Sequence, residues 1–291
     1  MKFKVLALSV LLVLAIPCIF AADGVLKPYF LAANLEGDLE SNLETIGKKL
    51  TDQNFEILGN YTPYENVRII IVTNDALKNN AAASEFGGYG AVQRIALTKV
   101  EDNIQLTYTN PVYMAHVYRL KSDLSDVAAQ LKEALGSLKE FGSEEGLPVK
   151  KLRKYHYMMA MPYFDDPLEL AEFDTHDKAV AAVEKGLAAG LGGTIPVYKV
   201  EIPGKDEVLF GVGLKDGSGA DSTVMGTCDK GEIKHSAHLP YELLVSKGDV
   251  YALHGKFRIA QSFPDLTMGT FMKIVGAPGS IKDSLKAVTG N

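Results

Sequence analysis

Cysteine is almost absent from this sequence. Only Cys18 and Cys228 occur among its 291 residues. Cys18 lies in an N-terminal segment that we expect to be removed, so Cys228 is alone in the mature chain and no intramolecular disulfide can form. In an oxidising compartment such a thiol is buried, bound to a metal or paired with another chain. Burial is the commonest of these states, because free cysteine is among the most often buried residues.

Long apolar runs are also scarce. One such run covers residues 5–20, after Lys2 and Lys4 and before the small residues Ala21 and Ala22. This pattern is typical of a secretory signal peptide. The run is shorter than the roughly 20 residues that a membrane-spanning helix needs. We therefore expect a signal peptide over residues 1–21, a periplasmic or secreted mature protein, and no integral membrane segment after cleavage.

Basic residues are fewer than acidic ones. The net charge of −6 becomes −8 in the mature chain, because Lys2 and Lys4 leave with the signal peptide. Polyanions are bound by clustered lysine and arginine side chains. The one dense basic run, at residues 150–154, is typical of a solvated linker. The charge balance thus argues against nucleic acid as a partner.

Catalytic signatures are missing as well. The chain contains no G-x-S-x-G nucleophile elbow and no H-E-x-x-H zinc motif. The glycines of residues 211–219 end a predicted strand and lead into a polar loop, without the helix N-terminus that would bind phosphate. An enzyme is therefore the third-ranked function class, and it would use Cys228 with His235 or His238 as a catalytic pair.

What the sequence does contain is one succession of landmarks that occurs twice. A charged, glycine-containing boundary near residues 142–153 divides the mature chain into two repeats, 22–145 and 146–291. Each repeat opens with a predicted strand, an amphipathic helix and two paired strands. The first repeat has strands at 27–33, 57–61 and 67–73 and a helix around Leu43, Ile46 and Leu50; the second has strands at 154–162, 197–202 and 207–214 and a helix around Ala179, Val183 and Leu187, capped by Asp174 or Thr175.

The last third of each repeat adds a hairpin, a proline, a methionine-containing stretch and a final helix. We interpret the repeated order as an internal duplication. It predicts an α+β fold of two tandem related domains, each an antiparallel sheet with helices packed on one face. The predicted segments are strands 94–98 and 104–109, Pro111 and helix 123–138 in the first repeat, and strands 241–245 and 250–260, Pro264 and helix 280–288 in the second.

These hairpins resemble the bacterial domain of unknown function family numbered 302. The resemblance rests on residues 104–114 and on the segment from Leu239-Pro240 to Met268, which are similar to that family's LP-containing strand, turn, second strand and proline-to-methionine ending. Residues 92–94 of the first repeat, Val-Gln-Arg, stand where the LP pair would be. The resemblance implies an α+β fold and a tendency of domains to pair. The two repeats would then pack as a pseudo-dimer with a groove between them.

The best chemical candidate is the set of Cys228, His235 and His238. All three lie within residues 225–240. A thiolate and two imidazoles are suitable ligands for zinc or copper if the turn at Lys230 and Gly231 brings them together. The sequence therefore predicts a candidate metal or haem site at this position. The alternative is a packed thiol beside histidines on an exposed loop.

Two function classes follow from these observations. The first is a noncatalytic exported protein that binds a metal, haem or small ligand at or near the groove between the repeats. The second is a cofactor-free interaction or scaffold protein of the cell envelope whose loops contact a partner protein. Homo-oligomerisation remains open for both classes.

Overall fold

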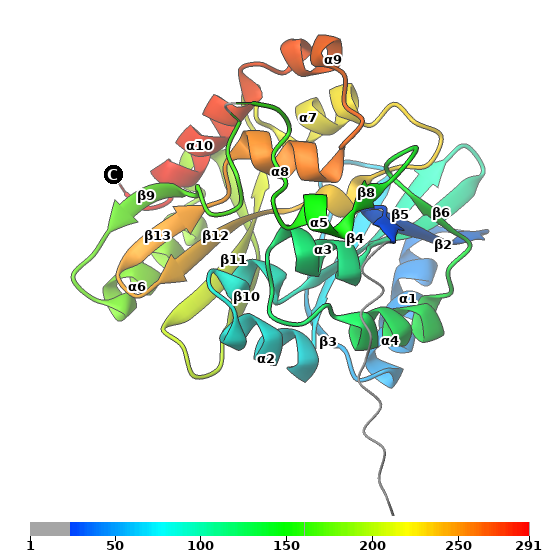
Figure 1. Cartoon of the computed structure of the whole chain (residues 1–291), viewed down its shortest axis with the longest axis horizontal. Helices are drawn as coiled ribbons and strands as arrows, with labels where there is room; N and C mark the ends of the chain where they lie inside the picture. The colour runs from blue at the N-terminus through cyan, green and yellow to red at the C-terminus, as the bar shows by residue number, and fades with distance from the viewer. Residues whose placement is uncertain (1–23, 160, 291) are drawn as a thin grey trace, which may run out of the picture.

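The computed structural model describes residues 24–159 and 161–290, so the predicted signal peptide lies outside the described residues. These residues form two large antiparallel sheets and one two-stranded sheet, with helices packed against the large ones, which confirms the predicted α+β class (Figure 1). In the described part of the chain, no helix combines the length and the hydropathy required to cross a membrane.

The first sheet has six strands in the order β3-β4-β5-β6-β2-β7. Helix α1 packs on β3, β4 and β5, and α4 packs on α1 and β2. The elements of this half are β1 (Val25–Leu26), β2 (Tyr29–Leu35), α1 (Leu39–Asp52), β3 (Glu56–Tyr61), β4 (Val67–Thr73), α2 (Asp75–Ala83), η1 (Gly87–Gly90), β5 (Gln93–Val100), β6 (Asn103–Thr109), α3 (Pro111–Val117), α4 (Ser125–Leu135) and β7 (Lys139–Phe141).

The second sheet has five strands in the order β10-β11-β12-β13-β9, with α6 packed on β10 to β13. A small sheet of β1 and β8 joins the start of the first half to the start of the second. The elements of the second half are β8 (Leu147–Pro148), α5 (Val149–Leu152), β9 (Leu168–Glu172), α6 (His176–Ala188), η2 (Leu191–Gly193), β10 (Thr194–Glu201), β11 (Glu207–Leu214), α7 (Asp221–Cys228), η3 (Ser236–His238), β12 (Tyr241–Ser246), β13 (Asp249–Ala252), α8 (Gly255–Ser262), α9 (Met268–Lys273) and α10 (Ala277–Ala287).

Several helices begin where short polar side chains cap them. The Asp38 carboxylate accepts from the backbone N–H of Ser41 at the start of α1. Thr175, one of the two predicted caps, accepts from Lys178 N at the start of α6. A side-chain oxygen at this position binds a backbone N–H that the first helical turn leaves free.

The two halves share one connectivity. The five main strands have the order β3-β4-β5-β6-β2 in the first sheet and β10-β11-β12-β13-β9 in the second. In each half, the strand that comes first in the sequence therefore lies beside the strand that comes last of the five. Their β-bulges also coincide: Ile57/Gly59 of β3 corresponds to Pro196/Tyr198 of β10, and Leu31/Ala33 of β2 to Glu169/Ala171 of β9. Bulges are specific features of a sheet, so the two sheets agree in bulge positions as well as in strand order.

Equivalent segments of the two halves each contact the sheet of the other half. Segment η1 of the first half packs on β11 and β12, and η3 of the second packs on β4, β5 and β6. The edge strands β3 and β10 lie against each other, where Gly59 faces the backbone of Val197 so closely that a side chain would clash. Reciprocal contacts of this kind are the mark of a two-fold related interface. The two halves of the described chain thus contact each other through equivalent segments.

Buried charge lies in this interface. Arg94 of β5 pairs with Glu242 of β12, which also accepts from Arg258 Nε of α8 at 3.2 Å. All three side chains are almost completely buried. A buried charge is tolerated when it is paired and hydrogen-bonded. The pairing therefore ties one half to the other through Glu242.

Two predicted strands are wrong. Residues 154–159, 161 and 162 lie in turns, bends and irregular backbone, and the first strand of the second sheet in chain order is β9. The predicted strand 250–260 ends at Ala252, because the His254 side chain caps α8 by accepting from Lys256 N. The cap equivalent to His254 in the first half is Asn110, at the start of α3. Pro111 therefore corresponds to Gly255 rather than to Pro264.

Candidate functional site

His238 is the most deeply buried of the three predicted ligands, with 1% of its surface exposed. Its Nδ1 accepts from Arg258 Nη1 at 3.0 Å, and its Nε2 lies 3.3 Å from the Tyr241 hydroxyl. Burial and the charges of Arg258 and Arg94 hold the pKa of His238 well below its ordinary value. The ring is therefore neutral, with both nitrogens engaged within the protein and neither directed to a metal.

Cys228 ends α7 and is partly buried. Burial, and after it the negative charge of Asp229, raises the pKa of this thiol to about 11. A thiol with that pKa is protonated at neutral pH, whereas a nucleophile requires the thiolate. The environment of Cys228 thus favours the packed thiol among the states that the sequence left open.

His235 has a different environment. Its Nδ1 lies 2.9 Å from Asp229 Oδ1, and its backbone N–H donates to the other oxygen of the same carboxylate, also at 2.9 Å. A carboxylate only accepts hydrogen bonds, so Nδ1 carries a proton, and in the neutral ring Nε2 carries the lone pair. Nε2 has no hydrogen-bond partner among residues 24–159 and 161–290. The Asp229 side chain is only 5% exposed, which makes it a firm support for the ring.

Aromatic rings fix the plane of His235. The ring centroids of Phe263, Phe141 and Tyr29 lie 4.8, 5.1 and 5.3 Å from that of His235. Phe263 belongs to the second half, whereas Phe141 and Tyr29 come from β7 and β2 of the first. His235 is thus held by both halves, and its orientation depends on their packing.

His235 and Cys228 line one pocket of about 510 Å³ between the halves. Sites for small molecules commonly have volumes of roughly 300–1,000 Å³, with mostly apolar walls and a few polar groups. Phe141, Phe263 and Leu266 supply apolar walls here. The pocket also carries Lys27 and Lys139 from the first half and Lys230 from the second, with carboxylates of Glu140, Glu144 and Asp265.

The lysines of this pocket have no carboxylate partner within 4.0 Å in the described part of the chain. Lys27 donates instead to the backbone oxygen of Glu144 at 2.7 Å. Asp265 accepts from the Ser143 hydroxyl at 3.0 Å and from the backbone N–H of Glu144. These hydrogen bonds connect the loop that precedes α9 to the first half. The lysine ammonium groups are thus available to an anionic group of a ligand.

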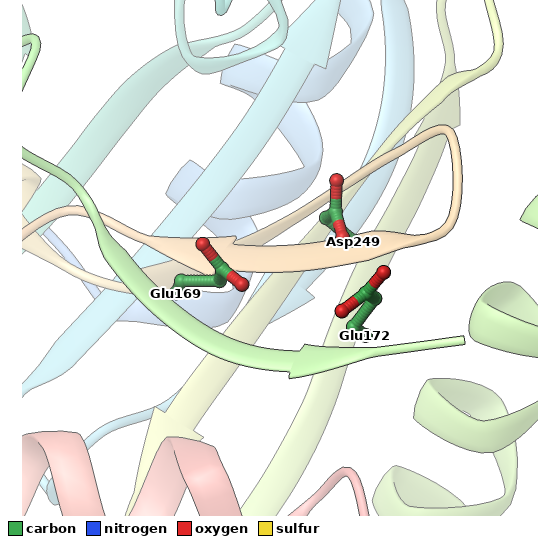
Figure 2. Close-up of side chains that lie close together, drawn as sticks. All are labelled: Glu169, Glu172 and Asp249. Atoms are coloured by element: carbon green, nitrogen blue, oxygen red, sulfur yellow. The ribbon is translucent and has the colours of Figure 1, made fainter. Parts of the chain in front are cut away.

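Cys228, His235 and His238 do not form a three-ligand set. In the described residues, the one group of three or more such side chains with ligand atoms within 4.8 Å of one another is Glu169, Glu172 and Asp249. Figure 2 shows these carboxylates projecting together from β9 and β13. They lie on an edge strand and the strand beside it, and Glu169 and Glu172 are exposed. Exposed acids of this kind are solvated by water and require no ion.

Sequence reasoning missed Asp229, Phe141 and Phe263. Asp229 directly follows Cys228 and stands six residues before His235, so a search for a carboxylate partner of each histidine would have found it. The aromatic walls carry no such signal, because Phe141 and Phe263 meet only when the halves pack.

Comparison with models of protein families, with curated proteins and with solved structures found no match to this chain.

Proposed function

We propose that this protein is a noncatalytic, exported binding protein that holds a small ligand in the pocket between its halves. The observation that carries the proposal is the fixed imidazole of His235, with Nδ1 on Asp229 and the lone pair of Nε2 available in the pocket. Preorganised polar groups in an apolar cleft are the usual anchors of small-molecule sites.

The chemistry around His235 favours binding over catalysis. The rings packed on it belong to Tyr29, Phe141 and Phe263, and the neighbouring thiol of Cys228 is protonated. A hydrolase of the Cys–His kind needs a thiolate within hydrogen-bond reach of the base. The lone pair at Nε2 suits a ligand that brings a proton donor or a metal ion.

A second candidate function is a scaffold of the cell envelope, which an exposed apolar surface favours. Met268 and Met272 of α9, with Val275 beyond it, recur at helical spacing and are 41, 57 and 59% exposed. Beside this stripe, Phe271 of α9 is buried and stacks on Tyr157, with ring centroids 6.0 Å apart. Exposed apolar stripes mark contact surfaces in many proteins.

The test of the binding function is what the protein carries when purified. The mature chain from residue 22 is expressed to the periplasm, and its denatured extract is analysed by mass spectrometry, elemental analysis and absorption. We expect a stoichiometric small molecule that is lost in His235→Gln and in the pocket-filling variant Leu266→Trp. The matched control is His176→Gln, because His176 contacts the Lys247 backbone oxygen outside the pocket.

Identical extracts from the mature chain and both pocket variants would contradict the binding function. Co-purification of an envelope protein that is lost in Met272→Ser, with no small molecule in any extract, would support the scaffold instead.

A further inference from the structure

The donor atoms of the pocket define which ligand it suits. We infer that the ligand is a metal chelate of the iron-porphyrin class, with His235 Nε2 as an axial ligand to its metal. This inference rests on the proposed function and names the ligand class of the same pocket. Three independent features lead to it: the number of protein donors, the second shell of the histidine, and the charge and shape of the pocket.

The number of donors argues against a bare metal ion. Protein sites for zinc and copper need about three or four protein ligands. Here His235 supplies one nitrogen, His238 uses both of its nitrogens on Arg258 and Tyr241, and no group of three or more ligand atoms within 4.8 Å of one another in the described residues includes His235. A metal bound at His235 must therefore arrive with its other positions already filled by an organic chelate.

The second shell of His235 is that of a metal-ligating histidine. Such a histidine donates its other ring N–H to a carboxylate or a carbonyl, which fixes the tautomer and makes the ligating nitrogen more basic. Asp229 provides this contact at 2.9 Å and is itself buried. A single histidine with this support is also the commonest way in which proteins hold haem iron from one side.

The apolar walls and the lysines suit an apolar chelate with acidic side groups, although the carboxylates of Glu140, Glu144 and Asp265 also line the pocket. Phe141, Phe263 and Leu266 offer apolar surface within a pocket of about 510 Å³. Porphyrins of the haem class carry carboxylate side groups. Lys27 and Lys139 on one side and Lys230 on the other have no carboxylate partner within 4.0 Å in the described residues, so their ammonium groups can pair with such side groups.

The experiment compares hemin with metal-free protoporphyrin IX, a probe of the same shape and charge that lacks the metal. Both are titrated into the mature full-length chain and followed by absorption. We expect hemin to bind at one equivalent with a shifted Soret band, and metal-free protoporphyrin at least about tenfold more weakly. His235→Gln should lower hemin affinity by at least about tenfold and abolish the band shift, whereas His176→Gln should change neither.

Asp229 is a positioning residue in this scheme. Asp229→Asn should lower hemin affinity about 10- to 100-fold, as second-shell changes do at other metal sites. It should also alter the Soret band of the complex that still forms, since the iron then has a less basic axial ligand. Thermal unfolding without hemin separates this effect from a loss of folding.

Each failure has a distinct meaning. Equal binding of hemin and metal-free protoporphyrin, unchanged in His235→Gln, would overturn the metal-chelate inference while the binding function stands. Absence of binding of either porphyrin would also overturn the inference. The binding function would then be tested only by the analysis of what the purified protein carries.

Discussion

Buried tyrosine hydroxyls of this protein fall into two groups. Tyr113 donates to the backbone oxygen of Gln261 at 2.8 Å, a contact between α3 of the first half and α8 of the second. The equally enclosed hydroxyl of Tyr198 has no partner among the described residues. A buried polar group without a partner costs about 1–3 kcal/mol, whereas a hydrogen bond contributes about 0.5–1.5 kcal/mol.

The same substitution should therefore have opposite effects at the two tyrosines. We expect Tyr113→Phe to lower the free energy of unfolding by about 1 kcal/mol and Tyr198→Phe to leave it unchanged or raise it by a similar amount. Urea unfolding followed by circular dichroism measures both. A loss of 1 kcal/mol or more in Tyr198→Phe would show that its hydroxyl has a partner after all.

Asp221 provides a pH-dependent contribution to stability. Burial raises the pKa of its carboxyl to about 7, although hydrogen bonds from Tyr61 and from Leu214 N act in the opposite direction. The unfolded aspartate ionises near pH 4. Between these values the folded state binds more protons than the unfolded state, so the contribution of Asp221 falls as the pH rises from 4 to 7 and is constant above 7.

Asp221→Asn should remove this dependence. As the pH rises from 4 to 7, the free energy of unfolding of the wild type should fall relative to the variant by a few kcal/mol, since each pKa unit corresponds to about 1.4 kcal/mol. Urea unfolding at pH 4, 5.5 and 7 tests this, with exposed Asp102→Asn as the control. Parallel curves for the wild type and Asp221→Asn would contradict the prediction.

At the scale of elements, the approach of β3 to β10 depends on Gly59. An added Cβ at this position would overlap the backbone oxygen of Val197, and backbone cannot move aside as a flexible side chain can. Gly226, inside α7, has open space where a Cβ would lie. Alanine also favours a helix over glycine by about 1 kcal/mol.

Substitution by alanine should thus change the free energy of unfolding in opposite directions at Gly59 and Gly226. We expect Gly59→Ala to lower the free energy of unfolding by about 2 kcal/mol or more, because overpacking forces the edge strands apart. Gly226→Ala should raise it by up to about 1 kcal/mol. Thermal and urea unfolding measure both changes, and an equal, small effect of the two would mean that β3 and β10 do not depend on close contact.

The elements also show where sequence patterns succeed. Helices α1 and α6 were predicted from apolar residues at helical spacing, and α6 also from a capping side chain, and both signals act locally. The segment after β13 was predicted as a continued strand because its apolar residues suit a buried strand as well as a buried helix. His254, whose side chain caps α8, is not among the usual capping residues, so the helix start was not recognised.

At the scale of the whole molecule, Arg94 and Glu242 occupy equivalent positions. Arg94 lies on β5 opposite Ile71, the fifth residue of β4. Glu242 lies on the equivalent strand β12 opposite Gly211, the fifth residue of β11. Two identical halves paired in this way would place Arg against Arg or Glu against Glu. The opposite charges thus favour pairing of the first half with the second over pairing of like halves.

Loss of the shared carboxylate should weaken both halves together. Glu242→Gln leaves Arg94 and Arg258 without their counter-charge, and we expect a loss of about 3–5 kcal/mol. Arg94→Met should cost less, because Glu242 keeps Arg258. Exposed Asp52→Asn, which breaks the surface pair with Lys48, should cost less than about 1 kcal/mol.

The readout is urea unfolding with hydrogen exchange resolved over both halves. We expect both halves to unfold in one transition in every variant, because η1 and η3 each pack on the sheet of the other half. Separate transitions of the two halves in the wild type would contradict the dependence of each half on the other.

The sequence by itself determined the local features: the α+β class, most strands, the helices with caps, and the repeated order of elements. These depend on periodicity and capping, which act over a few residues. Only the tertiary structure decided which histidine is available. His235 and His238 are three residues apart and look alike in sequence, yet Arg258 and Tyr241 enclose one, and Asp229 holds the other beside the pocket. The physical reason is that Arg258 reaches His238 from a later helix, and the rings of Tyr29 and Phe141 reach His235 from the other half, so the surroundings of each histidine form only when the chain folds.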